Sequence, residues 1–240
     1  MTGVRSPARP TALVTGASRG IGRAIARRLA ATHDVVAVAR SADALATLAA
    51  DVPDGRVETV VADVGDPGVG DVLAAALGAR PVDVLVHNAG VGVLKPLLEL
   101  GPAEWRRMVD VNVNALYHVT QAVLPGMVAR ERGHVVLIGS VAGRSAFAGG
   151  AGYAATKHFG MGFAESLMLE VRDAGVKVSV VSPGSVKTGF SGREKPGAGP
   201  EWQLVPEDVA DAVAYAIATP PGVLVHRVEV RALSPKRARG

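Results

Sequence analysis

The stretch from Thr11 to Gly22, TALVTGASRGIG, decides the fold of this chain. It begins with a short apolar run typical of a buried strand and continues into a glycine-rich turn. It then leads into a segment in which Ile21, Ile25 and Leu29 share one helical face. A strand, a glycine turn and a helix in this order place backbone N–H groups and a helix N-terminus against a pyrophosphate. We therefore predict a dinucleotide site, although the spacing G-x-x-x-G-x-G is not the standard G-x-G-x-x-G and glycines also serve ordinary tight turns. The residues expected to contact the dinucleotide in this turn are Gly16, Ser18, Arg19, Gly20, Ile21 and Gly22.

Apolar runs and helical segments alternate along the rest of the chain. The predicted strands cover 11–15, 34–39, 57–62, 82–86, 135–139, 177–181 and 225–230, and the predicted helices cover 23–30, 42–50, 71–79, 102–127, 152–174 and 206–219. This alternation predicts an α/β fold, a Rossmann-type doubly wound parallel sheet with strand order 3-2-1-4-5-6-7 and helices on both faces. A chain of 240 residues is expected to form a single domain, here with flexible ends at 1–10 and 234–240.

The end of the second predicted strand indicates which dinucleotide is bound. The sequence Val38-Ala39-Arg40-Ser41 contains no acid that could hold a ribose 2′-hydroxyl, and Arg40 stands where a cation can accommodate the 2′-phosphate of NADP. Arg19, inside the glycine turn, adds a second cation on the same side. Both could be ordinary surface arginines, but together with the missing acid they favour NADP(H) over NAD(H).

The ends of the third and fourth predicted strands carry further candidate cofactor contacts. Asp63, followed by Val64, can either hydrogen-bond the adenine amine or cap the helix that follows. Asn88, Ala89 and Gly90 follow the fourth strand, where small residues let a cofactor approach closely.

Tyr153 and Lys157 are the candidate catalytic pair. They are four residues apart in a predicted helix and therefore lie on one face. A nearby ammonium favours the phenolate, so Lys157 is expected to lower the pKa of Tyr153 from about 10 toward the range of general acid–base catalysis. Ser140 ends the fifth strand and can donate a hydrogen bond to a carbonyl or alkoxide. Taken alone, a Tyr–Lys pair at this spacing also occurs on ordinary amphipathic helices.

The composition changes between residues 189 and 206. Glycines, prolines and charges gather there, flanked by Phe190 and Trp202. Because ligands bind outside the carboxyl ends of the strands in open α/β sheets, this segment is predicted to be a substrate loop.

The overall composition excludes several other kinds of site. Without any cysteine the chain can form no disulfide, cysteine metal site or thiol nucleophile, and no metal is expected. The net charge of +4 comes largely from basic ends that lack a nucleic-acid-binding motif, so solvated tails are favoured over nucleic-acid contact. No apolar run approaches the roughly 20 residues of a membrane helix and no secretory signal is evident, so a cytoplasmic protein is expected, with no membrane partner.

These motifs together resemble the classical short-chain dehydrogenase/reductase family, and the match covers nearly the whole chain, from Thr11 to Ala232. It rests on the T-G-x-x-x-G-x-G from Thr15 to Gly22, the D-V of Asp63-Val64, the N-A-G from Asn88 to Gly90, the helix Asn112, Ser140, the Y-x-x-x-K of Tyr153 and Lys157, and the P-G of Pro183-Gly184 with Val186 and Thr188. Each motif alone is weak, but all of them in this order are specific.

The resemblance implies an enzyme that moves a hydride between NADP(H) and a carbonyl/alcohol pair, with reduction as the expected direction. Tyr153 would be the acid or base, Ser140 would orient the carbonyl, and Asn112 would position a water of the proton relay. Lys157 would also hold the nicotinamide ribose. Asn88 to Gly90, with Pro183, Gly184, Val186 and Thr188, would line the nicotinamide end.

The resemblance also implies a homodimer or homotetramer formed through the two long helices. A tetramer contact is less well supported, because the glycine-rich C-terminal segment of many family members is missing here. The alternative is a dinucleotide-sensing or scaffold protein that kept the fold without the chemistry, but such proteins usually lose a catalytic residue and none is missing. A nucleotide-sugar epimerase or dehydratase would need a longer C-terminal region.

Overall fold

The computed structural model describes residues 9–190 and 199–234. The strands are β1 (Thr11–Thr15), β2 (Asp34–Ala39), β3 (Val57–Val61), β4 (Val84–His87), β5 (Gly133–Ile138), β6 (Val176–Pro183) and β7 (Arg227–Val230). The α-helices are α1 (Gly20–Ala30), α2 (Ala42–Asp51), α3 (Val69–Leu77), α4 (Pro102–Val109), α5 (Ala115–Ala129), α6 (Ala151–Val171) and α7 (Pro206–Ile217). Short 3₁₀ turns lie at Pro53–Gly55, Leu97–Glu99, Val141–Gly143 and Arg172–Ala174. None of the helices in the described part of the chain is long and apolar enough to cross a membrane.

The seven strands form one parallel sheet in the order β3-β2-β1-β4-β5-β6-β7, which confirms the predicted topology. The order reverses between β1 and β4, because β2 and β3 lie on one side of β1 and the later strands on the other. In such sheets the ligand binds at this reversal, beyond the carboxyl ends of the strands.

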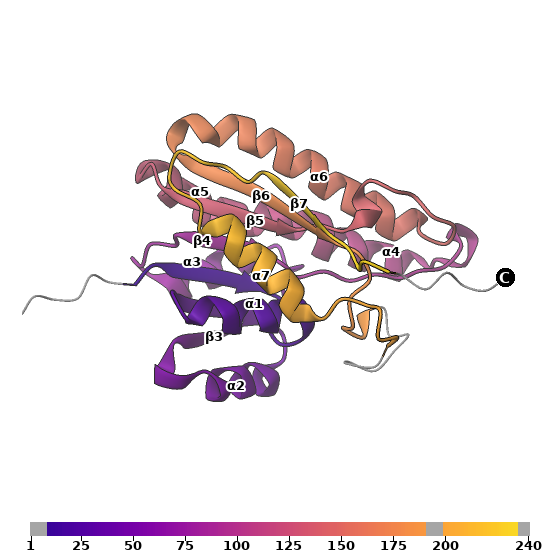
Figure 1. Ribbon diagram of the computed structural model, residues 1–240, viewed down its shortest axis with the longest axis horizontal. Coiled ribbons are helices and arrows are strands. Elements are labelled where there is room, and N and C mark those ends of the chain that lie inside the picture. Colours follow the sequence, from indigo (N-terminus) through magenta and orange to yellow (C-terminus); the bar gives the residue numbers. More distant parts are fainter. Residues whose placement is uncertain (1–8, 191–198, 235–240) are drawn as a thin grey trace, which may run out of the picture.

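Helices cover both faces of the sheet (Figure 1). Alternate residues of the strands contribute to two apolar cores, one on each face. Leu13 of β1 points toward α3, α5 and α6, whereas its neighbours Ala12 and Val14 point toward α1, α2 and α7. Successive strand side chains face opposite sides of a sheet, so a strand covered on both faces must be apolar throughout. This explains the valine-rich runs by which the strands can be found in the sequence.

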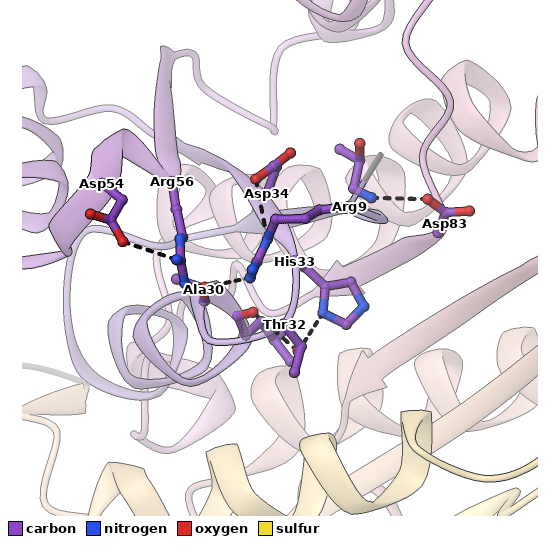
Figure 2. A network of polar contacts seen from close by, with 10 residues as sticks. Arg9, Ala30, Thr32, His33, Asp34, Asp54, Arg56 and Asp83 are labelled. Atoms are coloured by element: carbon purple, nitrogen blue, oxygen red, sulfur yellow. Dashed lines mark hydrogen bonds and ion pairs between the residues drawn. The ribbon is translucent and has the colours of Figure 1, made fainter. Parts of the chain in front are cut away.

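A polar network closes the opposite, amino-terminal edge of the sheet (Figure 2). The Arg9 side chain donates to the Ala30 carbonyl at 2.9 Å and pairs with Asp34 at 3.6 Å. The backbone N–H of Thr11 donates to Asp83 at 2.9 Å. Residues 9 and 10 were expected to belong to a flexible end, but these bonds, and one from the Asp34 N–H to the Pro10 carbonyl, tie them to the sheet. The rest of the predicted flexible ends, 1–8 and 235–240, lies outside the described residues.

The predicted single helix over 102–127 is wrong in one respect. Helix α4 is followed by a π-helical turn, Asp110–Asn114, before α5 begins at Ala115. Such turns are frequent at functional sites. This one contains Asn112, whose place in the middle of a helix otherwise has no local explanation.

Two buried histidines make the fold sensitive to acid. His87 bonds to the Thr120 hydroxyl at 2.9 Å, and His134 bonds to the Ser179 hydroxyl at 2.7 Å. Burial lowers the pKa of each to about 4, with Lys177 adding to the effect at His134. The unfolded chain therefore binds more protons between pH 6.5 and 4, and stability falls as the pH drops through this window. We expect the free energy of unfolding, measured by urea denaturation, to fall by about 2 kcal/mol per histidine between pH 7.5 and 5.

The matched variant for this test is His87→Gln with His134→Gln, because an amide can still bond to each hydroxyl but does not titrate. Between pH 7.5 and 5, this variant should lose about 4 kcal/mol less unfolding free energy than the unaltered chain. Equal pH dependence in both proteins would show that these imidazoles are not responsible.

Candidate active site

A single long cleft of about 1080 Å³ runs along the carboxyl-terminal edge of the sheet. All the predicted site residues except Asn112 line it: Gly16, Ser18, Arg19, Gly20, Ile21, Gly22, Arg40, Asp63, Val64, Asn88, Ala89, Gly90, Ser140, Tyr153, Lys157, Pro183, Gly184, Val186 and Thr188. Residues that the sequence analysis did not single out also line it, among them Leu94 and Arg107. The glycine turn and the Tyr–Lys pair therefore belong to one site.

The glycine turn folds so tightly that two of its positions exclude a side chain. Gly16 has φ +67°, and a Cβ there would lie 2.8 Å from the Ala89 Cα. A Cβ on Gly22 would lie 2.3 Å from both the Gly16 carbonyl oxygen and the Asn88 side-chain nitrogen. These positions are glycines because the turn packs directly against the segment that follows β4.

Thr15 and Asn88 hold the turn against that segment. The Thr15 hydroxyl donates to the Val86 carbonyl and accepts from the backbone N–H groups of Asn88 and Ala89, both at 3.1 Å. The Asn88 amide donates to the carbonyls of Thr15 and Gly16 at 2.9 and 3.1 Å. The Asn88 amide nitrogen is therefore engaged in shaping the turn. In the sequence Thr15 stands out only as part of the T-G-x-x-x-G-x-G motif, and its position just before Gly16 is the signal that could have identified it.

The amino end of α1 offers a place for an anion. The first N–H groups of a helix have no partner within it. The capping residue Arg19 makes no side-chain cap, and the first turn of α1 carries no acid. Arg19 and Arg40 are both exposed at this end of the cleft. The free N–H groups and the helix dipole suit a pyrophosphate, and the two arginines suit a further phosphate. The residues present therefore fit the predicted NADP(H).

Asp63 lines the cleft beside Arg40 and is bound by a residue that the sequence did not indicate. Arg107 of α4 donates to one of its carboxylate oxygens at 3.0 Å and forms an ion pair with the other at 3.0 Å, and the backbone N–H of Gly65 donates at 2.9 Å. Arg40 stands 3.9 Å from the same carboxylate. Partial burial pushes the pKa of Asp63 upward, but these bonds and the two arginine charges hold it below its usual range. Asp63 is therefore an ionised carboxylate.

Ser140 and Tyr153 meet at the other end of the cleft. Ser140 follows β5 and caps the short turn Val141–Gly143, where its hydroxyl accepts from the Ala142 N–H at 3.1 Å. Tyr153 lies in the first turn of α6, with its hydroxyl within hydrogen-bonding reach of Ser140. The two hydroxyl groups can therefore face the same substrate oxygen.

The pKa of Tyr153 differs from the expectation. Burial raises it above 10, and the hydrogen bond with Ser140 only partly opposes this. The expected lowering by Lys157 is not found: its ammonium is 6.0 Å from the centre of the phenol ring, and burial is the larger influence on the phenol. Tyr153 is therefore protonated near neutral pH, the form that donates a proton.

Lys157 is held beneath the tyrosine by the backbone of β5. Its ammonium donates to the Ile138 carbonyl at 3.0 Å. Burial lowers its pKa to about 8. A Cβ on Gly90 would lie 3.7 Å from its nitrogen, so the predicted N-A-G segment faces it across the cleft. Lys157 can therefore change its charge within the pH range in which most enzymes work.

Asn112 lies behind the cleft and connects three segments. Its amide exchanges two hydrogen bonds with the backbone of Val91, at 2.9 and 2.8 Å, and donates to the Thr156 hydroxyl at 2.9 Å. Thr156 in turn donates to the Tyr153 carbonyl at 2.8 Å. The π-helical turn thus places Asn112 where it ties the backbone of Tyr153 to the loop after β4. Thr156 was missed, because its hydroxyl gains meaning only once the π-helical turn that carries Asn112 lies against α6.

An aromatic side chain covers the tyrosine. The Phe190 ring lies 5.4 Å from that of Tyr153, tilted by 54°. A Cβ on Gly92 would lie 2.5 Å from the Phe190 ring, so this glycine makes room for it. Gly189, Phe190 and Gln203, from the predicted substrate loop, line the cleft, whereas 191–198 lies outside the described residues.

No group of three or more histidine and carboxylate side chains that could hold a metal occurs in 9–190 and 199–234.

Residues 10–198 match the family described as short chain dehydrogenase. The NADP-dependent 3-hydroxy acid dehydrogenase YdfG of Salmonella typhi is 38% identical over 231 residues, which is 91% of this chain and 93% of that protein.

Two solved structures agree closely with this fold. An alcohol dehydrogenase from the archaeon Thermococcus sibiricus, complexed with 5-hydroxy-NADP, is 30% identical and superposes with a TM-score of 0.88 over 95% of this chain and 99% of that one. The closed form of serine dehydrogenase complexed with NADP⁺ is 32% identical, with a TM-score of 0.86 over 96% and 100% of the two chains.

Proposed function

The chain belongs to the short-chain dehydrogenase family, and we propose that it is an NADP(H)-dependent oxidoreductase that interconverts a carbonyl compound and an alcohol, working mainly as a reductase. One observation carries this proposal: Ser140, Tyr153 and Lys157 line the same cleft as a glycine turn flanked by two arginines. The alternative, a sensor or scaffold of the same fold, is not favoured by relatives named as dehydrogenases.

The two hydroxyl groups carry out the proton chemistry. When bound, the nicotinamide supplies the hydride. The Ser140 hydroxyl donates a hydrogen bond to the substrate carbonyl oxygen and stabilises the charge that develops there. Tyr153 then gives its proton to that oxygen, which becomes the alcohol. Burial raises the pKa of Tyr153, so the protonated phenol that this step requires is the form present at neutral pH.

Lys157 and Asn112 support this step in different ways. Lys157 holds the ribose hydroxyls of the cofactor and returns a proton toward Tyr153, for which a pKa of about 8 is suited. Asn112 fixes the backbone of Tyr153 through Thr156. The proposed role of Asn112 in positioning a relay water rests on the family resemblance, since its amide already bonds to Val91 and Thr156.

We also propose a homo-oligomer formed through α5 and α6, where Tyr117 and Phe159 are exposed. Large exposed aromatic side chains are common where one subunit covers another. A cytoplasmic location stays a prediction from the sequence.

The cofactor preference tests the assignment of Arg40. We expect kcat/KM for NADPH to exceed that for NADH by about 10- to 100-fold, because charge-assisted hydrogen bonds to the 2′-phosphate contribute about 1.5–3 kcal/mol. The measurement is cofactor oxidation followed by absorbance with a panel of ketones, aldehydes, quinones and 3-oxoacyl thioesters.

Arg27→Gln is the matched control for Arg40→Gln, because Arg27 is also exposed but lies in the last turn of α1, away from the cleft. Only the Arg40 variant should lose the preference. A preference for NADH in the unaltered protein would contradict the proposed cofactor, whereas NADPH binding without turnover on any panel member would favour the non-catalytic alternative.

A further inference from the structure

The Asp63 carboxylate stands between two arginines that it engages unequally. Arg107 makes one hydrogen bond to it at 3.0 Å and an ion pair with its other oxygen at 3.0 Å, whereas the Arg40 nitrogen remains 3.9 Å away, too far for a hydrogen bond. The Arg40 side chain is 64% exposed, and that of Arg107 is 35% exposed and packs near Gly65, where a Cβ would lie 2.9 Å from its nitrogen. Arg107 is thus committed to Asp63, while Arg40 faces the open end of the cleft.

This arrangement bears on how a 2′-phosphate is bound. An ionised Asp63 without Arg107 would draw Arg40 into a close ion pair and would also repel a phosphate nearby. With Arg107 in place, the carboxylate charge is already compensated. We propose that Arg107 is a positioning residue that neutralises Asp63 and so leaves Arg40 available for the 2′-phosphate, setting the preference for NADPH over NADH. This inference rests on the proposed function.

Three further features support this assignment. Asp63 keeps its negative charge at neutral pH, because the Arg107 bonds outweigh the effect of partial burial on its pKa, so it needs a cationic partner. The two terminal nitrogens of Arg107 lie 3.0 Å from the two different oxygens of Asp63, a two-point contact that suits the planar guanidinium. The backbone bond from Gly65 fixes the carboxylate in this orientation.

The experiment measures equilibrium dissociation constants of NADPH and NADH by fluorescence titration, without substrate, for Arg107→Gln and three companions. Arg106→Gln is the matched control: it removes the same charge from the neighbouring residue of α4, which is exposed and makes no ion pair within the described part of the chain. Arg107→Lys restores the charge without the paired geometry. The double variant Arg107→Gln with Asp63→Asn removes both charges. The ratio of the two dissociation constants reports on the 2′-phosphate, because NADPH and NADH differ only in that group.

We expect Arg107→Gln to reduce the preference for NADPH about tenfold, because it weakens NADPH binding and has little effect on NADH binding. Arg106→Gln should leave the ratio unchanged, Arg107→Lys should recover part of it, and the double variant should recover most of it.

An unchanged ratio in Arg107→Gln would overturn the inference. So would an equal loss in Arg106→Gln, which would point to net charge alone, or a double variant that does not recover, which would mean that Arg107 contacts the phosphate itself. Thermal unfolding of each variant checks that it is folded. If Arg107→Gln is not folded, the ratio for Arg107→Lys tests the inference in its place. Failure of the unaltered protein to bind NADPH would overturn the proposed function instead.

Discussion

Tyr153→Phe is expected to lower kcat for carbonyl reduction by about a thousandfold, which corresponds to about 4 kcal/mol of lost transition-state stabilisation. The change removes one oxygen and keeps the ring, so the contact with Phe190, 5.4 Å between ring centres, can persist. What is lost is the proton donor that Ser140 orients toward the substrate oxygen.

The same variant should still bind NADPH. The glycine turn and Lys157 hold the cofactor in the proposed mechanism, and neither depends on the phenol oxygen: the turn is fixed by Thr15 and Asn88, and the ammonium by the Ile138 carbonyl. Single-turnover measurement of NADPH oxidation, beside equilibrium titration of NADPH, separates the two effects. Tyr215→Phe is the matched control, because this tyrosine on α7 is exposed and does not line the cleft. Turnover in Tyr153→Phe within tenfold of the unaltered protein would exclude Tyr153 as the acid.

The topology could be predicted because its signals are local. The five inner strands are buried on both faces and are therefore largely apolar, and the connecting helices carry their own periodicity. The glycine turn could be predicted for the same reason, since its tight packing is encoded at the positions of Gly16 and Gly22 themselves.

The contacts of the cleft depend on residues far apart in the chain and could not be predicted in this way. Arg107 meets Asp63 across 44 residues, and nothing in the sequence around either identifies the other. The π-helical turn at Asn112 leaves no trace except an asparagine where a helix would not favour one.

The pKa of Tyr153 shows the limit of spacing arguments. Four residues of separation correctly place Tyr153 and Lys157 on one helix face, but the distance between the charge and the ring, 6.0 Å, and the burial of both decide the pKa. Burial disfavours the charged form of each group, so it raises the pKa of the phenol and lowers that of the ammonium. The direction of the shift at Tyr153 is thus a property of the packed site, in which Phe190 covers the ring.

Lys157→Met carries the second large expected effect, a fall in kcat/KM for reduction of about a hundredfold or more. Methionine keeps much of the length and apolar character of the stem but has no ammonium to hold the ribose or return a proton. The lost charged hydrogen bonds should also weaken NADPH binding by about tenfold. Lys187→Met is the matched control, because Lys187 is near in sequence to the cleft residues but does not line the cleft.

The pH dependence of kcat/KM distinguishes a role of the Lys157 charge in the reaction from a role in packing alone. With a pKa of about 8, Lys157 is charged below that pH and neutral above it, so kcat/KM for reduction should decline as the pH rises through 8. Tyr153 remains protonated over the same range because its pKa is raised, so it cannot cause this decline. Lys157→Met should therefore show low activity without the decline, and Lys187→Met should keep it. If the decline near pH 8 persisted in Lys157→Met, another group would have to be titrating. The titration of Lys157 would then not affect the rate, and Lys157 would contribute only by holding the cofactor.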